Sequence, residues 1–127
     1  MNTAVIVDSS LSMRKDWVWI DSMANLLNAD YRVFKSEPNN IADLGSDVLK
    51  NVVGYDNLIL ISDGWFAEKY VNKVIKELVN FKSCKFICVD SSESQLNNEK
   101  FNQAFQDYGT VIIVNPSIEA SVFAKTL

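Results

Sequence analysis

The sequence predicts an α/β domain with a doubly wound, mostly parallel five-stranded sheet and helices on both faces. Short apolar runs rich in β-branched residues alternate along the chain with longer segments of helical periodicity. The first run is apolar at every position from Ala4 to Val7, which is typical of a strand buried on both faces of a parallel sheet. The predicted strands that begin at residues 3 and 57 each end in an aspartate. Because strand crossovers are almost always right-handed, this alternation favours placing the first strand in the middle of the sheet, beside the third.

The first half of the chain begins with a strand at residues 3–8 and a helix capped by Ser10 or Ser12. The apolar residues of this helix recur at spacings of three and four: Met13, Trp17, Ile20, Ala24 and Leu27. The same helix carries a second apolar stripe, formed by Trp19, Met23 and Leu26. This stripe either widens the contact between the helix and the sheet or binds a partner. Residues 31–36 alternate like a short strand near the sheet edge. A loop then leads to a short helix from residue 46 or 47 to residue 52 or 53, with Gly54 as its C-terminal cap.

The second half continues the same alternation. An apolar strand at residues 57–63 precedes a helix over residues 65–81, whose apolar positions are Phe66, Tyr70, Val74, Leu78 and Phe81. A strand at residues 83–90 follows, then a helix over residues 96–108 that Gly109 ends. The last strand is expected at residues 110–115, and Pro116 is expected to open a final helix from Ser117 to about Lys125.

Composition limits the classes of function. The 127 residues, 48% hydrophobic, predict one domain over residues 1–127. The net charge of −4 and the lack of a basic stripe disfavour nucleic-acid binding. Without an apolar run approaching about 18 residues or a leader segment, we expect no membrane span and a cytoplasmic location. The chain has no histidine, which excludes imidazole zinc sites and catalysis by Ser-His or Cys-His pairs. Cys84 and Cys88 are four residues apart in one predicted strand, roughly 13 Å, and cannot bridge each other.

Oxygen-bearing side chains gather at two predicted strand ends. Asp8 ends the first strand and is followed by hydroxyls at every second position, Ser10 and Ser12. Asp63, followed by Gly64, ends the third predicted strand. If these strands are neighbours about 4.8 Å apart, both carboxylates can address one ion, directly or through water. The pattern therefore predicts a site for a hard divalent cation at the carboxyl edge of the sheet, where ligand sites of open α/β sheets lie.

These motifs resemble the von Willebrand factor A-type domains, a Rossmann-like family. Asp8-Ser-Ser10-Leu-Ser12 matches the family's Asp-x-Ser-x-Ser signature, and Leu58-Ile-Leu-Ile-Ser-Asp63-Gly64 is similar to its Asp-Gly strand end. Gly45-Ser46-Asp47 stands where the family has a threonine that begins a helix, so Ser46 is the matching position. The chain is short for the family, and only residues 31–36 stand in place of its usual edge hairpin.

The resemblance implies a metal-ion-dependent adhesion site formed by Asp8, Ser10, Ser12, Ser46 and Asp63, which holds Mg²⁺ or Mn²⁺. In that family the ion often takes its last ligand from an acidic side chain of a partner protein. The implied function is therefore metal-dependent protein binding without catalysis. Trp65 follows the second aspartate and is expected either at the rim of the site or packed on the sheet. Asp90, which begins a second Asp-x-Ser-x-Ser stretch, either belongs to a polar loop or lies at the same rim.

Alternative readings use the same residues. Asp8, Ser10 and Ser12 would also serve as helix caps without a metal. A strand-end aspartate and a later strand ending in Ser62 loosely resemble the haloacid-dehalogenase-like phosphatases, in which the aspartate is the nucleophile. Those enzymes carry a second aspartate where this chain has Ser10. A small flavodoxin-like or receiver-like domain is another possibility, although the acidic pair of a receiver's first strand is absent. The last alternative is a metal-free interaction domain that uses its first helix or an edge strand. The sequence does not determine the oligomeric state.

Overall fold

The computed structural model describes residues 2–8, 17–27, 31–35, 54–62, 75–89 and 99–125, without the side chains of Asp8, Trp17, residues 31–35, Glu99 and Lys100. The strands are β1 (Thr3–Asp8), β2 (Tyr31–Lys35), β3 (Asn57–Ser62), β4 (Ser83–Val89) and β5 (Thr110–Val114). The helices are α1 (Trp17–Leu26), the 3₁₀ helix η3 (Leu78–Asn80), α5 (Glu99–Gln106) and α6 (Ala120–Ala124). Of the helices within these ranges, none is long and apolar enough to cross a membrane.

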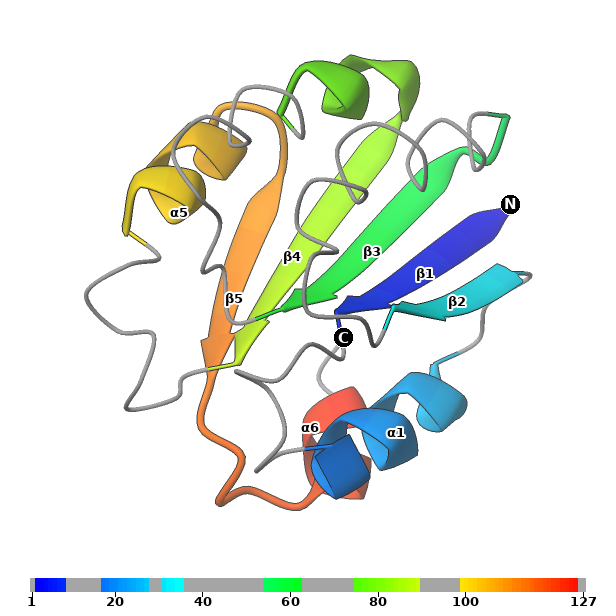
Figure 1. The fold of residues 1–127 in the computed structure, drawn as a ribbon, viewed down its shortest axis with the longest axis vertical. Coiled ribbons are helices and arrows are strands. Elements are labelled where there is room, and N and C mark those ends of the chain that lie inside the picture. The colour runs from blue at the N-terminus through cyan, green and yellow to red at the C-terminus, as the bar shows by residue number, and fades with distance from the viewer. Residues whose placement is uncertain are drawn as a thin grey trace.

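The strands form one sheet in the order β2-β1-β3-β4-β5, and each neighbouring pair is parallel (Figure 1). The expectation of an α/β fold with a parallel sheet is confirmed. β1 lies beside β3, as expected, and β2 is an edge strand. The expectation that β1 takes the middle position is wrong, because β3 lies there with two strands on each side. β4 and β5 both add to the side of β3 away from β1, which moves the centre of the sheet by one strand.

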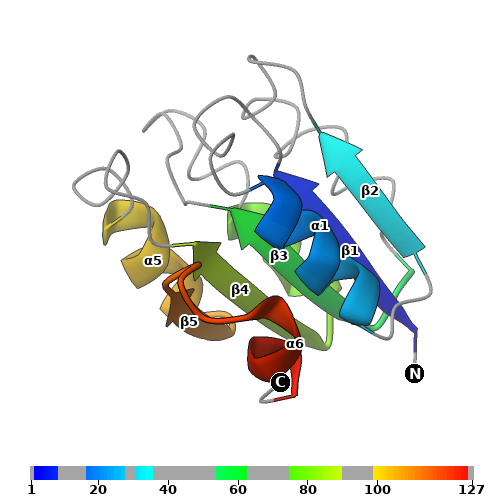
Figure 2. The same cartoon turned by 90° about the horizontal axis from the view of Figure 1, so that it is seen from below.

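Helices cover both faces of the sheet. Figure 2 shows α1 and α6 on the near face and α5 on the far face. Side chains of a strand alternate between the two faces. Alternate residues of β1 therefore enter different cores: Ala4 and Ile6 pack with α5, whereas Val5 and Val7 pack with α1 and α6. All four are fully buried, which explains why this strand carries no polar residue between Thr3 and Asp8.

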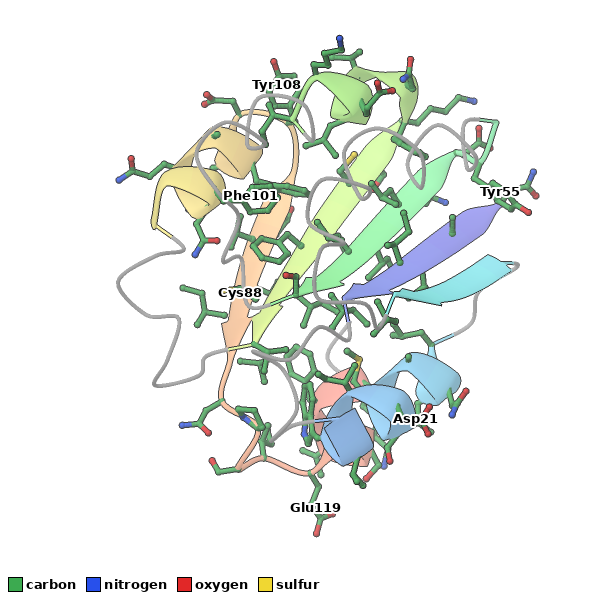
Figure 3. All side chains as sticks on the ribbon, viewed as in Figure 1. Asp21, Tyr55, Cys88, Phe101, Tyr108 and Glu119 are labelled. Atoms are coloured by element: carbon green, nitrogen blue, oxygen red, sulfur yellow. The ribbon has the colours of Figure 1, made fainter. Side chains whose placement is uncertain are left out.

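Three aromatic rings anchor α5 to its face of the sheet. Phe86 on β4 meets Phe101 edge-on at 5.0 Å between ring centroids, and Phe105 lies 5.5 Å from Phe86. Figure 3 shows Phe101 pointing from α5 toward the sheet. The three rings are at most 1% exposed. Because burying a large side chain contributes about 1.5–3 kcal/mol, this cluster is a main source of stability on the α5 face.

The opposite face is held by contacts between α1 and α6. The Trp19 ring of α1 lies 5.9 Å from Phe123 of α6, and its Nε1–H donates a hydrogen bond to the Ile118 carbonyl at 2.6 Å. In the second apolar stripe of α1, Met23 is fully buried and Trp19 is covered in part, whereas Leu26 is 53% exposed. Most of this stripe therefore packs inside the molecule.

The last helix begins later than predicted. The Asn115 side-chain oxygen accepts a hydrogen bond from the Ser117 N–H at 3.0 Å, and the Asn115 carbonyl accepts one from the Ile118 N–H at 3.2 Å. Residues 116–118, which the sequence predicts at the start of the helix, form this turn instead. Glu119 is still extended, and α6 starts at Ala120. The local Asx turn therefore overrides the preference of proline for the first helical turn.

Other predicted helices are described only in part. Residues 75–80 are helical within the predicted helix 65–81, and α5 lies within the predicted helix 96–108. The short helix predicted between residues 46 and 53 lies outside the described residues. Gly54, expected as its cap, has a φ of +112°, a conformation that glycine adopts without strain.

Candidate functional site

The carboxyl edge of the sheet is built by the ends of β1, β3 and β4. The register pairs Val7 with Ile61 and Ser62 with Cys88, so the three parallel strands end at nearly the same level. Asp8 is the last residue of β1 and is the register partner of Lys35 on β2. This edge lies next to the centre of the sheet, where β1 and β3 meet, and is the position at which open α/β sheets bind ligands.

Most of the predicted site residues belong to segments that follow these strand ends. Asp8 lies within β1, with only its backbone described. The other expected ligands, Ser10, Ser12, Ser46 and Asp63, lie outside the described residues, as do the expected rim residues Trp65 and Asp90. The backbone therefore brings together the strand ends that carry Asp8 and precede Asp63, and the coordination of an ion stays a prediction. Within the described ranges, no three carboxylate, thiol or imidazole side chains form a metal-binding group.

A small polar cluster lies under the carboxyl edge on the α5 face. Ser62 and Cys88 are fully buried register partners on β3 and β4. Asn102 of α5 is 9% exposed and directs its Nδ2–H to the Cys88 sulfur at 3.7 Å. Its Oδ1 is buried without a hydrogen-bond partner. Figure 3 shows Cys88 toward the carboxyl end of β4, below Phe101. The cluster interrupts a mostly apolar interface near the carboxyl ends of β3 and β4.

Asn102 belongs to none of the motifs found in the sequence. It lies between Phe101 and Phe105, on the side of α5 that faces the sheet. The available signal was a polar residue at a core-facing helical position, which in a buried site requires a partner for each polar atom. The thiol of Cys88 satisfies the amide nitrogen, and the oxygen keeps an unused acceptor.

The other cysteine is unsuited to nucleophilic chemistry. Cys84, near the start of β4, is 4% exposed, and its sulfur lies 3.6 Å from the Leu78 carbonyl oxygen. Burial raises the pKa of the Cys84 thiol from 9.0 to about 11. Because the thiolate is the reactive form, this cysteine is unreactive near neutral pH. Neither cysteine forms a disulfide, in agreement with their spacing along one strand.

Comparisons of the chain with protein-family models, with curated proteins and with solved structures found no match. The resemblance to the von Willebrand factor A-type domains therefore rests on the short motifs given above, and what it implies for function is a proposal.

Proposed function

We propose that the chain is a minimal, doubly wound domain of the von Willebrand factor A type that binds a protein partner through a divalent cation. The proposed ligands of Mg²⁺ or Mn²⁺ are Asp8, Ser10, Ser12, Ser46 and Asp63. The partner supplies an acidic side chain as a further ligand. Trp65 and Asp90 are proposed to lie at the rim, and the proposed location is cytoplasmic.

One observation carries the proposal: β1 and β3 are parallel neighbours with Val7 paired to Ile61. Asp8 follows this register pair by one residue on its strand, and Asp63 follows it by two. Parallel strands carry their carboxyl ends to the same edge, and neighbouring strands are about 4.8 Å apart. Had the two strands been separated by a third, the two aspartates would belong to distant parts of the edge.

Charge repulsion explains why such a pair favours a cation. If the two carboxylates lie as close as the strands that carry them, about 5 Å, they repel each other by roughly 3 kcal/mol at the effective dielectric constant of a protein surface, near 20. A divalent ion between them converts this repulsion into attraction. Mg²⁺ prefers carboxylate, hydroxyl and water oxygens in octahedral geometry, which matches the oxygen-only composition of the motif. Two carboxylates formally balance the charge of the ion, and its remaining ligands are neutral hydroxyl and water oxygens. The ion therefore stays electron-poor, and an acidic side chain of a partner can replace one of the waters.

Isothermal titration calorimetry with MgCl₂ and MnCl₂ tests the metal site. We expect saturable binding to the wild-type chain and at least about tenfold weaker binding to Asp8→Asn and to Asp63→Asn, because each loses a charge from the site. Asp107→Asn is the matched control, since Asp107 is an exposed aspartate after α5. It should bind like the wild type. Absence of metal binding in the wild type, or equal weakening in the control, contradicts the proposal.

Partner capture tests the function itself. A pull-down with the wild-type chain, with and without chelator, should retain a partner only when Mg²⁺ is present, and Asp63→Asn should not retain it. Capture that survives chelation and both aspartate substitutions would favour the metal-free interaction domain instead. Hydrolysis of p-nitrophenyl phosphate that Asp8→Asn abolishes would favour the phosphatase alternative.

A further inference from the structure

A row of polar side chains crosses the opposite, amino-terminal edge of the sheet. Thr3, Asn57 and Ser83 are the first residues of β1, β3 and β4, and the register makes them neighbours across the three strands. By strand alternation all three lie on the face that α1 and α6 cover. The Asn57 amide donates a hydrogen bond to the Thr3 hydroxyl at 3.4 Å. Both faces of a parallel sheet are usually apolar, so this row is an unusual feature.

Lys85 extends this row with a positive charge. It lies two residues after Ser83 on the same face of β4 and is the register partner of Ile59. The remainder of β4, residues 86–89, is fully buried. Lys85 itself is half-buried, and none of the acidic side chains that the structure describes lies within ion-pair distance. Nearby Lys82 differs, because it is 81% exposed and pairs with Asp56 at 3.6 Å. Among the described residues the Lys85 ammonium therefore has no acidic partner, and a carboxylate from outside would form a charge-assisted hydrogen bond with it.

A cavity of about 250 Å³ opens at this place. Its lining combines polar groups with aliphatic surface, and it consists of Thr3, Asn57, Leu58, Ile59, Ser83 and Lys85. The volume is somewhat below the range of roughly 300–1,000 Å³ that holds drug-sized ligands. The cavity therefore fits a ligand of a few heavy atoms with a charged end and an apolar end.

We propose that this cavity binds a short-chain organic carboxylate. The Lys85 ammonium forms the ion pair with the carboxylate, the Ser83 hydroxyl donates a hydrogen bond to it, and Ile59 contacts the aliphatic part. A fully oxygenated anion such as phosphate fits less well, because the aliphatic wall would face polar oxygens and the described part of the lining offers one cation, Lys85. The site is separate from the proposed metal site, since β1, six residues long, separates the two edges by roughly 20 Å.

The probe for the test is sodium butyrate, titrated into the ¹⁵N-labelled chain in the presence of EDTA, so that the result does not depend on any metal. We expect saturable shifts of the amide signals of residues 3, 57, 83 and 85, with a millimolar dissociation constant. Lys85→Met keeps the aliphatic stem and removes the charge, and it should weaken binding at least about tenfold. Lys82→Met is the matched control and should bind within about twofold of the wild type, because this lysine is exposed and already paired.

A second variant and two further probes make the outcome decisive. Ser83→Ala, at the exposed start of β4, should weaken butyrate binding severalfold and leave the fold intact. Butyramide, which matches butyrate without its charge, and inorganic phosphate should each bind at least about tenfold more weakly than butyrate. The proposal is overturned if butyrate gives no saturable shifts up to about 50 mM. It is also overturned if butyramide or phosphate binds as well as butyrate, or if Lys82→Met weakens binding as much as Lys85→Met.

Discussion

The turn between α5 and β5 gives the sharpest test of the packing, through the substitution Gly109→Ala. Gly109 donates its N–H to the Phe105 carbonyl at 3.0 Å, which ends α5 and turns the chain toward β5. A Cβ at this position would lie 2.9 Å from both the carbonyl carbon and the Cβ of Cys84, and even closer to the Cys84 carbonyl oxygen. Carbon atoms in contact prefer 3.5–4.0 Å, so the added methyl would be roughly 0.6–1.1 Å too close.

The loss of stability in Gly109→Ala depends on how far the backbone of Cys84 can move away from the added methyl group. Cys84 lies on β4, which is paired with β3 on one side and β5 on the other. Its backbone therefore cannot shift without disturbing two strand ladders. Overpacking typically costs about 1–3 kcal/mol, and we expect the upper end here, about 3 kcal/mol. With an unfolding entropy of about 2.1 cal/mol/K per residue, the midpoint of thermal unfolding should fall by roughly 11 °C for 127 residues.

Urea unfolding monitored by tryptophan fluorescence measures the loss, as the change in transition midpoint multiplied by the slope m. Gly54→Ala is the comparison variant, because an added Cβ there meets no described residue within 4 Å apart from its chain neighbours, whereas the φ of +112° opposes the substitution. That variant should lose about 1–2 kcal/mol, from backbone conformation alone. If Gly109→Ala lost less than about 1 kcal/mol, the close approach of this turn to β4 would be wrong.

Two further predictions concern buried polar groups on the α5 face. Asn102→Leu should raise the free energy of unfolding by about 1 kcal/mol, because it removes a buried oxygen without a partner. A loss of more than about 1 kcal/mol in urea unfolding would mean that the oxygen binds a further group. Burial raises the pKa of the Cys84 thiol from 9.0 to about 11 in the folded chain. Between these two pH values the unfolded chain loses the thiol proton and the folded chain keeps it. Stability present below pH 9 should therefore fall by up to about 2–3 kcal/mol as the pH rises to 11, and the change should be absent in Cys84→Ala under reducing conditions.

The strands were predictable from sequence because their signals are local. β1 and β3 are six-residue strands, each with four apolar residues between polar ends, and the structure places both as predicted to within a residue. The start of α6 was mispredicted although its signal is also local. Pro116 favours a helix start, but the Asn115 side chain competes by binding the Ser117 N–H. The preference of proline for a helix start and the preference of asparagine for a local turn therefore compete at residues 115–117. The prediction took only the proline into account.

The amino-edge row could not be predicted in the same way. Each of Thr3, Asn57 and Ser83, taken alone, is an ordinary polar residue at the start of a strand. They become one row only through a register that joins residues 54 and 26 positions apart in the sequence. Lys85 did carry a signal, since it interrupts an apolar run that forms a central strand. Interpreting that signal requires knowing which face of the strand it occupies and that α1 and α6 leave space there, and both depend on long-range packing.

The two proposed sites depend on different parts of the chain and therefore fail independently. The cation site at the carboxyl edge needs the segments that follow β1 and β3 to bring hydroxyls and carboxylates to one point, and the structure contributes the adjacency of the two strands. The carboxylate site at the amino edge is made by strand residues alone, whose register fixes their spacing. Loss of metal binding in Asp63→Asn should leave butyrate binding intact, and loss of butyrate binding in Lys85→Met should leave metal binding intact. If either substitution abolished both, the two edges would be coupled through β1 and β3, and neither effect could be assigned to direct contact with its ligand.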